Sequence, residues 1–131
     1  MPANVFRSIT IAGLAATAFL GAIPANAHPK LLMATPAAAS VADGKSDITL
    51  KFSEELVAQF SGMSIMMTNM PGMKMTAPMA VGTLTTTVGA DGKTLIGHLK
   101  APLSAGTYSL AWHAVSTDTH RVEGSYSFSV K

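Results

Sequence analysis

Hydrophobic and polar residues alternate along much of the chain, a pattern typical of strands that bury one face of a sheet. The clearest example is residues 107–115, whose large apolar side chains Tyr108, Leu110 and Trp112 all fall on one face. Similar alternation, or a run of β-branched residues, predicts the other strands. These are residues 31–34, 48–52, 60–68, 81–87, 94–99 and 126–130.

About seven short strands, regular turns and no long helical pattern predict an all-β domain built as a two-sheet β-sandwich. Asp91-Gly92 has the sequence of a hairpin turn between two of these strands. Ser53, followed by two acidic residues, predicts a single helical turn over residues 53–57. The sequence shows no internal repeat and no second domain.

The first 27 residues are predicted to be a secretory signal peptide rather than part of the domain. Arg7 precedes an apolar run over residues 9–23, and residues 25–27 (Ala-Asn-Ala) have the pattern of a cleavage site. The run lacks the ~20 apolar residues of a membrane span, so an uncleaved anchor is the weaker alternative. Cleavage after Ala27 would leave a soluble, exported domain of residues 28–131, and we expect a periplasmic location.

Charge and composition exclude several classes of function. Without Arg7, the exported domain carries eight basic and seven acidic residues, which gives no basic surface of the kind that nucleic acids require. The chain contains no cysteine, so disulfides and thiolate metal sites are both excluded. The domain must therefore be stabilised by its core or by a bound ligand.

Methionine is concentrated in residues 63–79, which contain seven of the nine methionines of the chain. Proline and glycine at positions 71, 72 and 78 interrupt regular structure in this stretch. The methionines predicted to lie on the resulting loop are Met70, Met73, Met75 and Met79. Two interpretations are equally supported by composition: a thioether site for Cu(I), or an apolar loop that packs on the sheet edge or contacts a partner.

A second candidate set contains nitrogen and oxygen donors. As a new amino terminus, His28 can chelate one metal ion through its α-amine and its imidazole Nδ1. Asp118 and His120 are two residues apart, so in an extended segment both side chains point to the same side. Glu54 is a further carboxylate. Such ligands suit Cu(II) in a square geometry.

Each residue of this set also has an ordinary structural explanation. Taken alone, Asp118 is better explained as a turn former that bonds its own backbone, and His120 as an exposed loop residue. A helix cap explains Glu54 as well as metal binding does. His98 and His113 lie in predicted strands, away from the aromatic core, and are not expected to bind metal.

Five short motifs occur in order along residues 28–131, at both ends and in the middle. They are His28-Pro29-Lys30-Leu31, Phe52-Ser53-Glu54, residues 67–73 (MTNMPGM), residues 105–108 (AGTY) and residues 112–120 (WHAVSTDTH). Together they resemble the CopC/PcoC family of periplasmic copper-resistance proteins. The resemblance covers essentially the whole exported domain.

The resemblance implies a seven-stranded Greek-key β-sandwich or barrel, related to cupredoxins and immunoglobulin-like folds, with copper sites at its two ends. It implies a Cu(II) site made by the amine and imidazole of His28, by His120, and by a carboxylate from Asp118 or Glu54. An inner-membrane partner of the CopD type is also implied.

The same resemblance implies a Cu(I) site of thioethers. Its ligands would be chosen from Met67, Met70, Met73 and Met79. Met75 stands where relatives with such a loop often have a histidine, so Met75 either replaces that ligand or only widens the loop. Met63 and Met66 are predicted to be packing residues.

We therefore expect a copper-binding protein that sequesters copper or carries it to a membrane transporter, without catalysis. The main alternative is a copper monooxygenase, because such enzymes also chelate copper through an amino-terminal histidine. A chain of this length offers little room for a substrate platform, and a carboxylate ligand would fill the position that oxygen needs. An interaction module whose methionine loop docks a partner is a third possibility.

Overall fold

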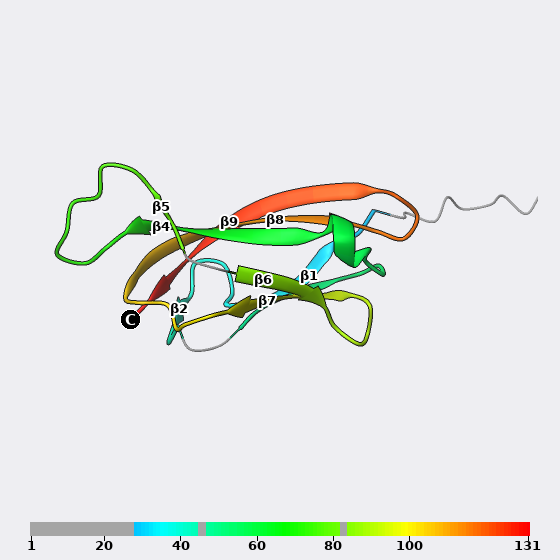
Figure 1. Cartoon of the computed structure of the whole chain (residues 1–131), viewed down its shortest axis with the longest axis horizontal. Helices are drawn as coiled ribbons and strands as arrows, with labels where there is room; N and C mark the ends of the chain where they lie inside the picture. The colour runs from blue at the N-terminus through cyan, green and yellow to red at the C-terminus, as the bar shows by residue number, and fades with distance from the viewer. Residues whose placement is uncertain (1–27, 45–46, 82–83) are drawn as a thin grey trace, which may run out of the picture.

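The structure is a computed structural model that describes residues 28–44, 47–81 and 84–131. The described residues form two β-sheets packed face to face (Figure 1). The first sheet contains β1 (Leu31–Thr35), β3 (Ile48–Phe52), β6 (Leu84–Val88) and β7 (Thr94–Leu99). The second contains β2 (Val41–Ala42), β4 (Gly62–Asn69), β5 (Met79–Ala80), β8 (Gly106–Val115) and β9 (Arg121–Val130).

The two sheets have the strand orders β1-β3-β7-β6 and β2-β9-β8-β4-β5. The chain passes from one sheet to the other between β1 and β2, β2 and β3, β3 and β4, β5 and β6, and β7 and β8. These crossings tie both sheets to one core, and the predicted all-β sandwich is confirmed. The prediction of seven strands omits β2 and β5, which have two residues each.

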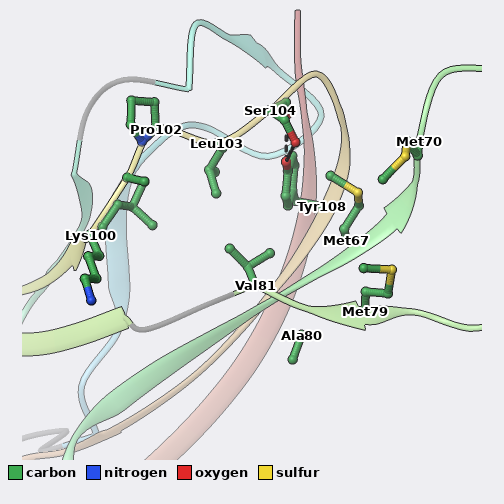
Figure 2. Close-up of a pocket in the computed structure, with 12 residues that line it drawn as sticks. Met67, Met70, Met79, Ala80, Val81, Lys100, Pro102, Leu103, Ser104 and Tyr108 are labelled. Atoms are coloured by element: carbon green, nitrogen blue, oxygen red, sulfur yellow. Dashed lines mark hydrogen bonds between the residues drawn. The ribbon is translucent and has the colours of Figure 1, made fainter.

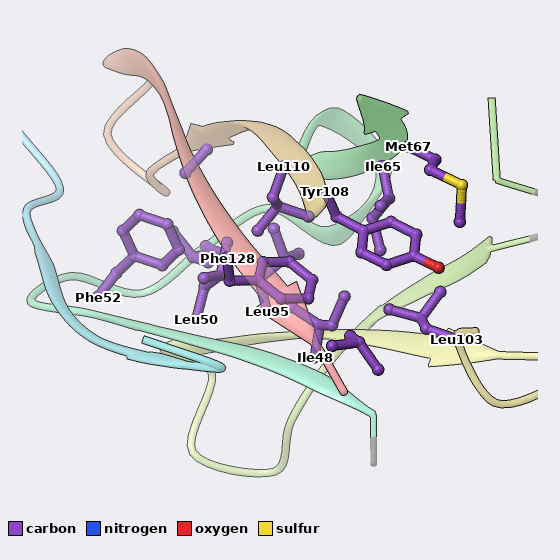
Figure 3. Close-up of a cluster of buried hydrophobic side chains, with 13 residues drawn as sticks. Ile48, Leu50, Phe52, Ile65, Met67, Leu95, Leu103, Tyr108, Leu110 and Phe128 are labelled. Carbon is purple, nitrogen blue, oxygen red and sulfur yellow. The ribbon is translucent and has the colours of Figure 1, made fainter. Parts of the chain in front are cut away.

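The core fills the space between the sheets with the residues that the alternation placed inward (Figure 3). In β8, Tyr108 and Leu110 are fully buried, and β9 contributes Phe128 from the neighbouring strand. Trp112 is half-buried and packs edge-on against Phe52, with ring centroids 5.1 Å apart. Aromatic pairs of this kind add to the stabilisation that burial alone provides.

The predicted helical turn over residues 53–57 is wrong. The described turn is a short 3-10 helix, η1 (Ala58–Phe60), and the Ser53 hydroxyl instead accepts a hydrogen bond from the Lys30 N–H at 2.9 Å. Leu56 forms an isolated β-bridge with Ser116. The backbone N–H groups of Ser53, Leu56 and Val57 donate to carbonyl oxygens of other segments, at Lys30, Gly92 and Val115, and not to a helical turn.

The signal-peptide prediction for residues 1–27 lies outside the described residues. Among the residues that are described, no helix has the length and apolar character needed to cross a membrane.

Candidate metal centres

The two predicted donor sets lie at opposite ends of the sandwich (Figure 1). One end holds the connection between β8 and β9, close to the start of the described chain. The other end holds the long loop between β4 and β5. The two ends are built differently.

The β8–β9 connection is a tight turn over residues 116–120. The Ser116 N–H donates to the His120 carbonyl oxygen at 2.9 Å, and the Thr119 N–H donates back to the Ser116 carbonyl oxygen at 2.9 Å. Thr119 has a φ of 75°, the left-handed conformation that lets the chain reverse here. The turn presents Asp118 and His120 on the surface at the end of the sandwich.

Asp118 and His120 contact each other within this turn. Asp118 Oδ2 lies 3.1 Å from His120 Nδ1, and both side chains are about half-exposed. The hydroxyl of Ser116 donates to Asp118 Oδ1. This bond, followed by the side chain and backbone N–H of His120, lowers the pKa of the Asp118 carboxyl. The carboxylate is therefore held in its charged form, the form that a metal ligand needs.

His28 lies beside this turn. Its ring centroid is 4.5 Å from that of His120, with the planes tilted by 48°. The chain is held in this position two residues after His28, because the Ser53 N–H donates to the Lys30 carbonyl oxygen at 2.9 Å. Two predicted imidazole ligands that are far apart in the sequence are thus brought into contact.

The third side chain of the predicted set, Glu54, is not drawn into these contacts. It follows Ser53, but no hydrogen bond or ion pair to its carboxylate occurs among the described residues. Within residues 28–44, 47–81 and 84–131, no three His, Asp or Glu side chains are gathered closely enough to hold one ion. In the uncleaved chain the main-chain nitrogen of His28 is part of a peptide bond, so this donor is absent before cleavage.

The methionine end is organised by β4 and β5. Met67, near the end of β4, pairs with Met79 at the start of β5. Met79 is therefore a strand residue, and its predicted place on the loop is wrong because it completes the edge of the second sheet. Between the strands, the Met73 N–H donates to the Met70 carbonyl oxygen at 3.2 Å, which closes a turn around Gly72.

A cavity of about 660 Å³ lies at this end of the molecule. Figure 2 shows Met67, Met70 and Met79 along one side of it, with Tyr108 beside Met67 and with Leu103 farther across. The structure therefore brings three of the five predicted thioethers to the wall of one cavity. The large apolar lining keeps polar donors few, which favours soft ligation over hard.

The methionines differ widely in exposure. Met67 is 6% exposed and belongs to the core, whereas Met73 and Met79 are 61% and 55% exposed. Met75 is partly buried against the core, but neither Met75 nor Met73 lines the cavity.

The two additional methionines of β4 behave differently from each other. Met63 packs against the core, as predicted. Met66 is exposed, so its predicted packing role is wrong. Because side chains alternate along a strand, Met66 falls on the face opposite Met67.

His98 forms a polar network that sequence patterns did not indicate. Its Nδ1 lies 2.8 Å from Asp47 Oδ2, and its Nε2 lies 2.9 Å from Thr87 Oγ1. Thr87 lies on β6, the outer strand of the first sheet. Both ring nitrogens are engaged within the protein, so a metal ion could bind this imidazole only by displacing one of these partners.

The CopC domain family matches residues 31–131, most of the chain. The chain belongs to the CopC family. It is 45% identical over 126 residues to copper resistance protein C of Xanthomonas campestris pv. juglandis, covering 96% of this chain and 98% of that protein. It is 50% identical over 107 residues to copper resistance protein C of Pseudomonas syringae pv. tomato, covering 82% and 83% respectively.

Solved structures of the CopC family confirm the fold. PcoC of Escherichia coli, described as a copper resistance protein, is 42% identical and superposes with a TM-score of 0.73. The match covers 78% of this chain and 99% of that one. A second crystal structure of the same protein describes it as methionine-rich. The resemblance read from the five motifs is therefore confirmed at the level of the family.

Proposed function

We propose that this protein is a periplasmic copper carrier that binds Cu(II) at one end of the sandwich and Cu(I) at the other. The supporting observation is the separation of two chemically different donor sets to opposite ends (Figure 1). Nitrogen and oxygen donors suit Cu(II), whereas thioethers suit Cu(I). Relatives named copper resistance proteins support copper as the metal.

In this proposal the Cu(II) ligands are the amine and imidazole of His28 and the imidazole of His120, with a carboxylate. The contact between the two rings supports this pairing. Asp118 contacts His120 directly, so it either completes the ligand set or orients His120, whereas Glu54 has no hydrogen bond or ion pair to either histidine. Cleavage after Ala27 would release the amine of His28 next to both groups.

The proposed Cu(I) site uses thioethers at the apolar cavity. Met67, Met70 and Met79 already line it. Met73 and Met75 lie on the intervening loop and join the site when that loop folds over the ion. Methionine has three rotatable bonds, so such a rearrangement costs little compared with moving a rigid side chain.

A carrier needs no catalysis, and the two sites differ in the oxidation state that they favour. Reduction of bound copper would therefore shift the preferred site from the histidine end to the methionine end. We propose that copper is then sequestered, or passed to an inner-membrane transporter of the CopD type.

The decisive experiment compares two versions of the exported domain. One begins at His28, and the other carries one extra residue before His28, which converts the amine into an amide. Cu(II) binding is followed by EPR and by competition with a chelator. We expect the extension to weaken Cu(II) binding strongly and to change the spectrum, because a bidentate chelate is lost.

Equal Cu(II) binding by the two versions would show that His28 is not a terminal ligand. The proposal would then rest on the Cu(I) site at the methionine end alone. The alternative, a copper monooxygenase, is tested on the same samples. Oxygen consumption that depends on copper and on an added reductant would support the enzyme and contradict a carrier.

A further inference from the structure

Ser116 is a buried serine whose hydroxyl is directed at the carboxylate of Asp118, which contacts the proposed copper ligand His120. It is only 2% exposed and lies at the point where β8 ends. Its hydroxyl donates to Asp118 Oδ1 and also lies 3.3 Å from the carbonyl oxygen of His120. A buried hydroxyl requires a partner, and the Ser116 hydroxyl donates to a carboxylate that itself contacts an imidazole.

The bond from Ser116 determines which oxygen of Asp118 faces His120. Oδ1 accepts the hydroxyl and lies 3.4 Å from the backbone N–H of His120. Oδ2 is left to face His120 Nδ1 at 3.1 Å. In a neutral imidazole, a proton on Nδ1 that is donated to this carboxylate leaves the lone pair on Nε2.

We infer that Ser116 is a positioning residue for the proposed Cu(II) site. By holding Oδ1 of Asp118, it turns Oδ2 toward His120 and leaves Nε2 of His120 as the nitrogen that receives copper. Partners of this kind orient metal ligands and fix their tautomers. The copper role rests on the proposed function, but the orientation of His120 exists without metal and is tested separately.

The hydroxyl is not needed to close the turn. Backbone hydrogen bonds between Ser116 and His120, and between Thr119 and Ser116, already do so. Ser61 provides the contrast, since it is also buried, but its hydroxyl accepts the N–H of Val115 and touches no proposed ligand. Ser61→Ala is therefore the matched control for losing a buried serine hydroxyl near this end.

The first measurement uses the metal-free domain that begins at His28. Nitrogen chemical shifts of His120, recorded by NMR at about pH 8 where an ordinary histidine is neutral, report which ring nitrogen carries the proton. We expect the Nδ1–H form to predominate in the unmodified protein and in Ser61→Ala. In Ser116→Ala the Nδ1–H tautomer of His120 should no longer predominate. The same should hold in Asp118→Asn, which removes the accepting carboxylate.

The second measurement is Cu(II) affinity and EPR on the same proteins. Loss of an outer partner typically weakens metal binding by about 10–100-fold, and we expect Ser116→Ala to fall about 10-fold with altered copper hyperfine splitting. Ser61→Ala should bind as the unmodified protein does, and Cu(I) affinity should be unchanged in both. Thermal unfolding of the metal-free variants verifies that each is folded.

Two results would overturn the inference. One is an unchanged His120 tautomer in a folded Ser116→Ala protein. The other is an equal loss of Cu(II) affinity in Ser61→Ala, which would make the effect a general one of stability. If the unmodified domain does not bind Cu(II) tightly, the proposed function fails instead, while the tautomer measurement still decides whether Ser116 orients His120.

Discussion

The two ends of the sandwich are built on opposite principles. At the histidine end, the residues 116–120 turn is closed by its own backbone and is joined to the preceding segment by a hydrogen bond from the Thr117 N–H to the Glu55 carbonyl oxygen. At the methionine end, the long β4–β5 loop contains one backbone hydrogen bond of this kind among its described residues, from Met73 to Met70. One end is rigid and polar, and the other is loosely tied and apolar.

This difference matches the demands of the two ions. Cu(II) favours a square arrangement of nitrogen and oxygen donors, so its ligands benefit from being held in place before the ion arrives. Thioethers are polarizable and mobile, so they can gather around a soft ion from several positions. We therefore expect substitutions at the histidine end to act through geometry and those at the methionine end through donor number.

The largest effect should come from removing an imidazole at the rigid end. Loss of an outer partner of a metal ligand weakens binding by up to about 100-fold, and loss of the ligand itself costs more. His120→Ala should therefore lower Cu(II) affinity by at least about 100-fold. Cu(I) affinity should be unchanged. Chelator competition with each oxidation state measures both. His113→Ala on β8 is the control, and a comparable loss there would contradict the assignment.

The methionine end can be tested without disturbing the fold. Met67 is a core residue, so Met67→Ala would cost about 2–5 kcal/mol and confuse binding with stability. Met67→Leu keeps the volume and should cost less than about 1.5 kcal/mol. We expect this variant to lose Cu(I) affinity and to keep its Cu(II) affinity.

Exposed Met73 provides the comparison for Met67. Met73→Leu should change stability by less than about 0.5 kcal/mol, as is usual at the surface, and should weaken Cu(I) binding less than Met67→Leu does. Cu(I) competition and thermal unfolding of both variants measure this difference. A greater loss of Cu(I) affinity in Met73→Leu would show that the loop, and not the cavity wall, holds the ion.

The sequence predicted the sandwich well because alternation is a local signal. The inward faces of β8 and β9 follow directly from residues such as Tyr108 and Phe128, whose burial the structure confirms. Strands of only two residues, such as β2 and β5, are too short to show an alternating pattern. The helical turn predicted at Ser53 fails because the backbone partners of this segment, Lys30 and Ser116, are distant in sequence.

The candidate sites were predictable as residue types and not as geometry. Asp118 and His120 were recognised from their spacing, but the buried hydroxyl of Ser116 beneath them gives no sequence signal of its own. The network of Asp47, His98 and Thr87 was missed for the same reason, since it joins three separate segments. Which methionines reach the cavity likewise depends on strand register, as the pairing of Met67 with Met79 shows.

His98 sharpens the comparison because it is an imidazole that belongs to neither proposed donor set. Its side chain and that of Asp47 are both about half-exposed, so His98→Ala should cost less than about 1 kcal/mol of stability. Both copper affinities should stay unchanged. Thermal unfolding and chelator competition test this together. A loss of Cu(II) affinity would mean that the donor set extends beyond the end of the sandwich.

The smallest effect concerns Asp91, in the hairpin turn that supports the rigid end. The Leu56 N–H donates to the Gly92 carbonyl oxygen, which links this turn to the segment bridged to Ser116. The hydroxyl of Thr94 and the backbone N–H of Lys93 lower the pKa of Asp91 below its ordinary value of 3.8.

Because the folded-state pKa of Asp91 is the lower one, its contribution to stability is present above the unfolded pKa and is lost as pH falls through the folded pKa. Asp91→Asn should therefore have a slightly lower Tm than the unmodified protein at neutral pH, and the difference should vanish in acid. Thr94→Val, which removes the principal cause of the shift, should show the same pH dependence. A Tm difference that stays constant with pH would mean that Asp91 acts through turn shape and not through its charge.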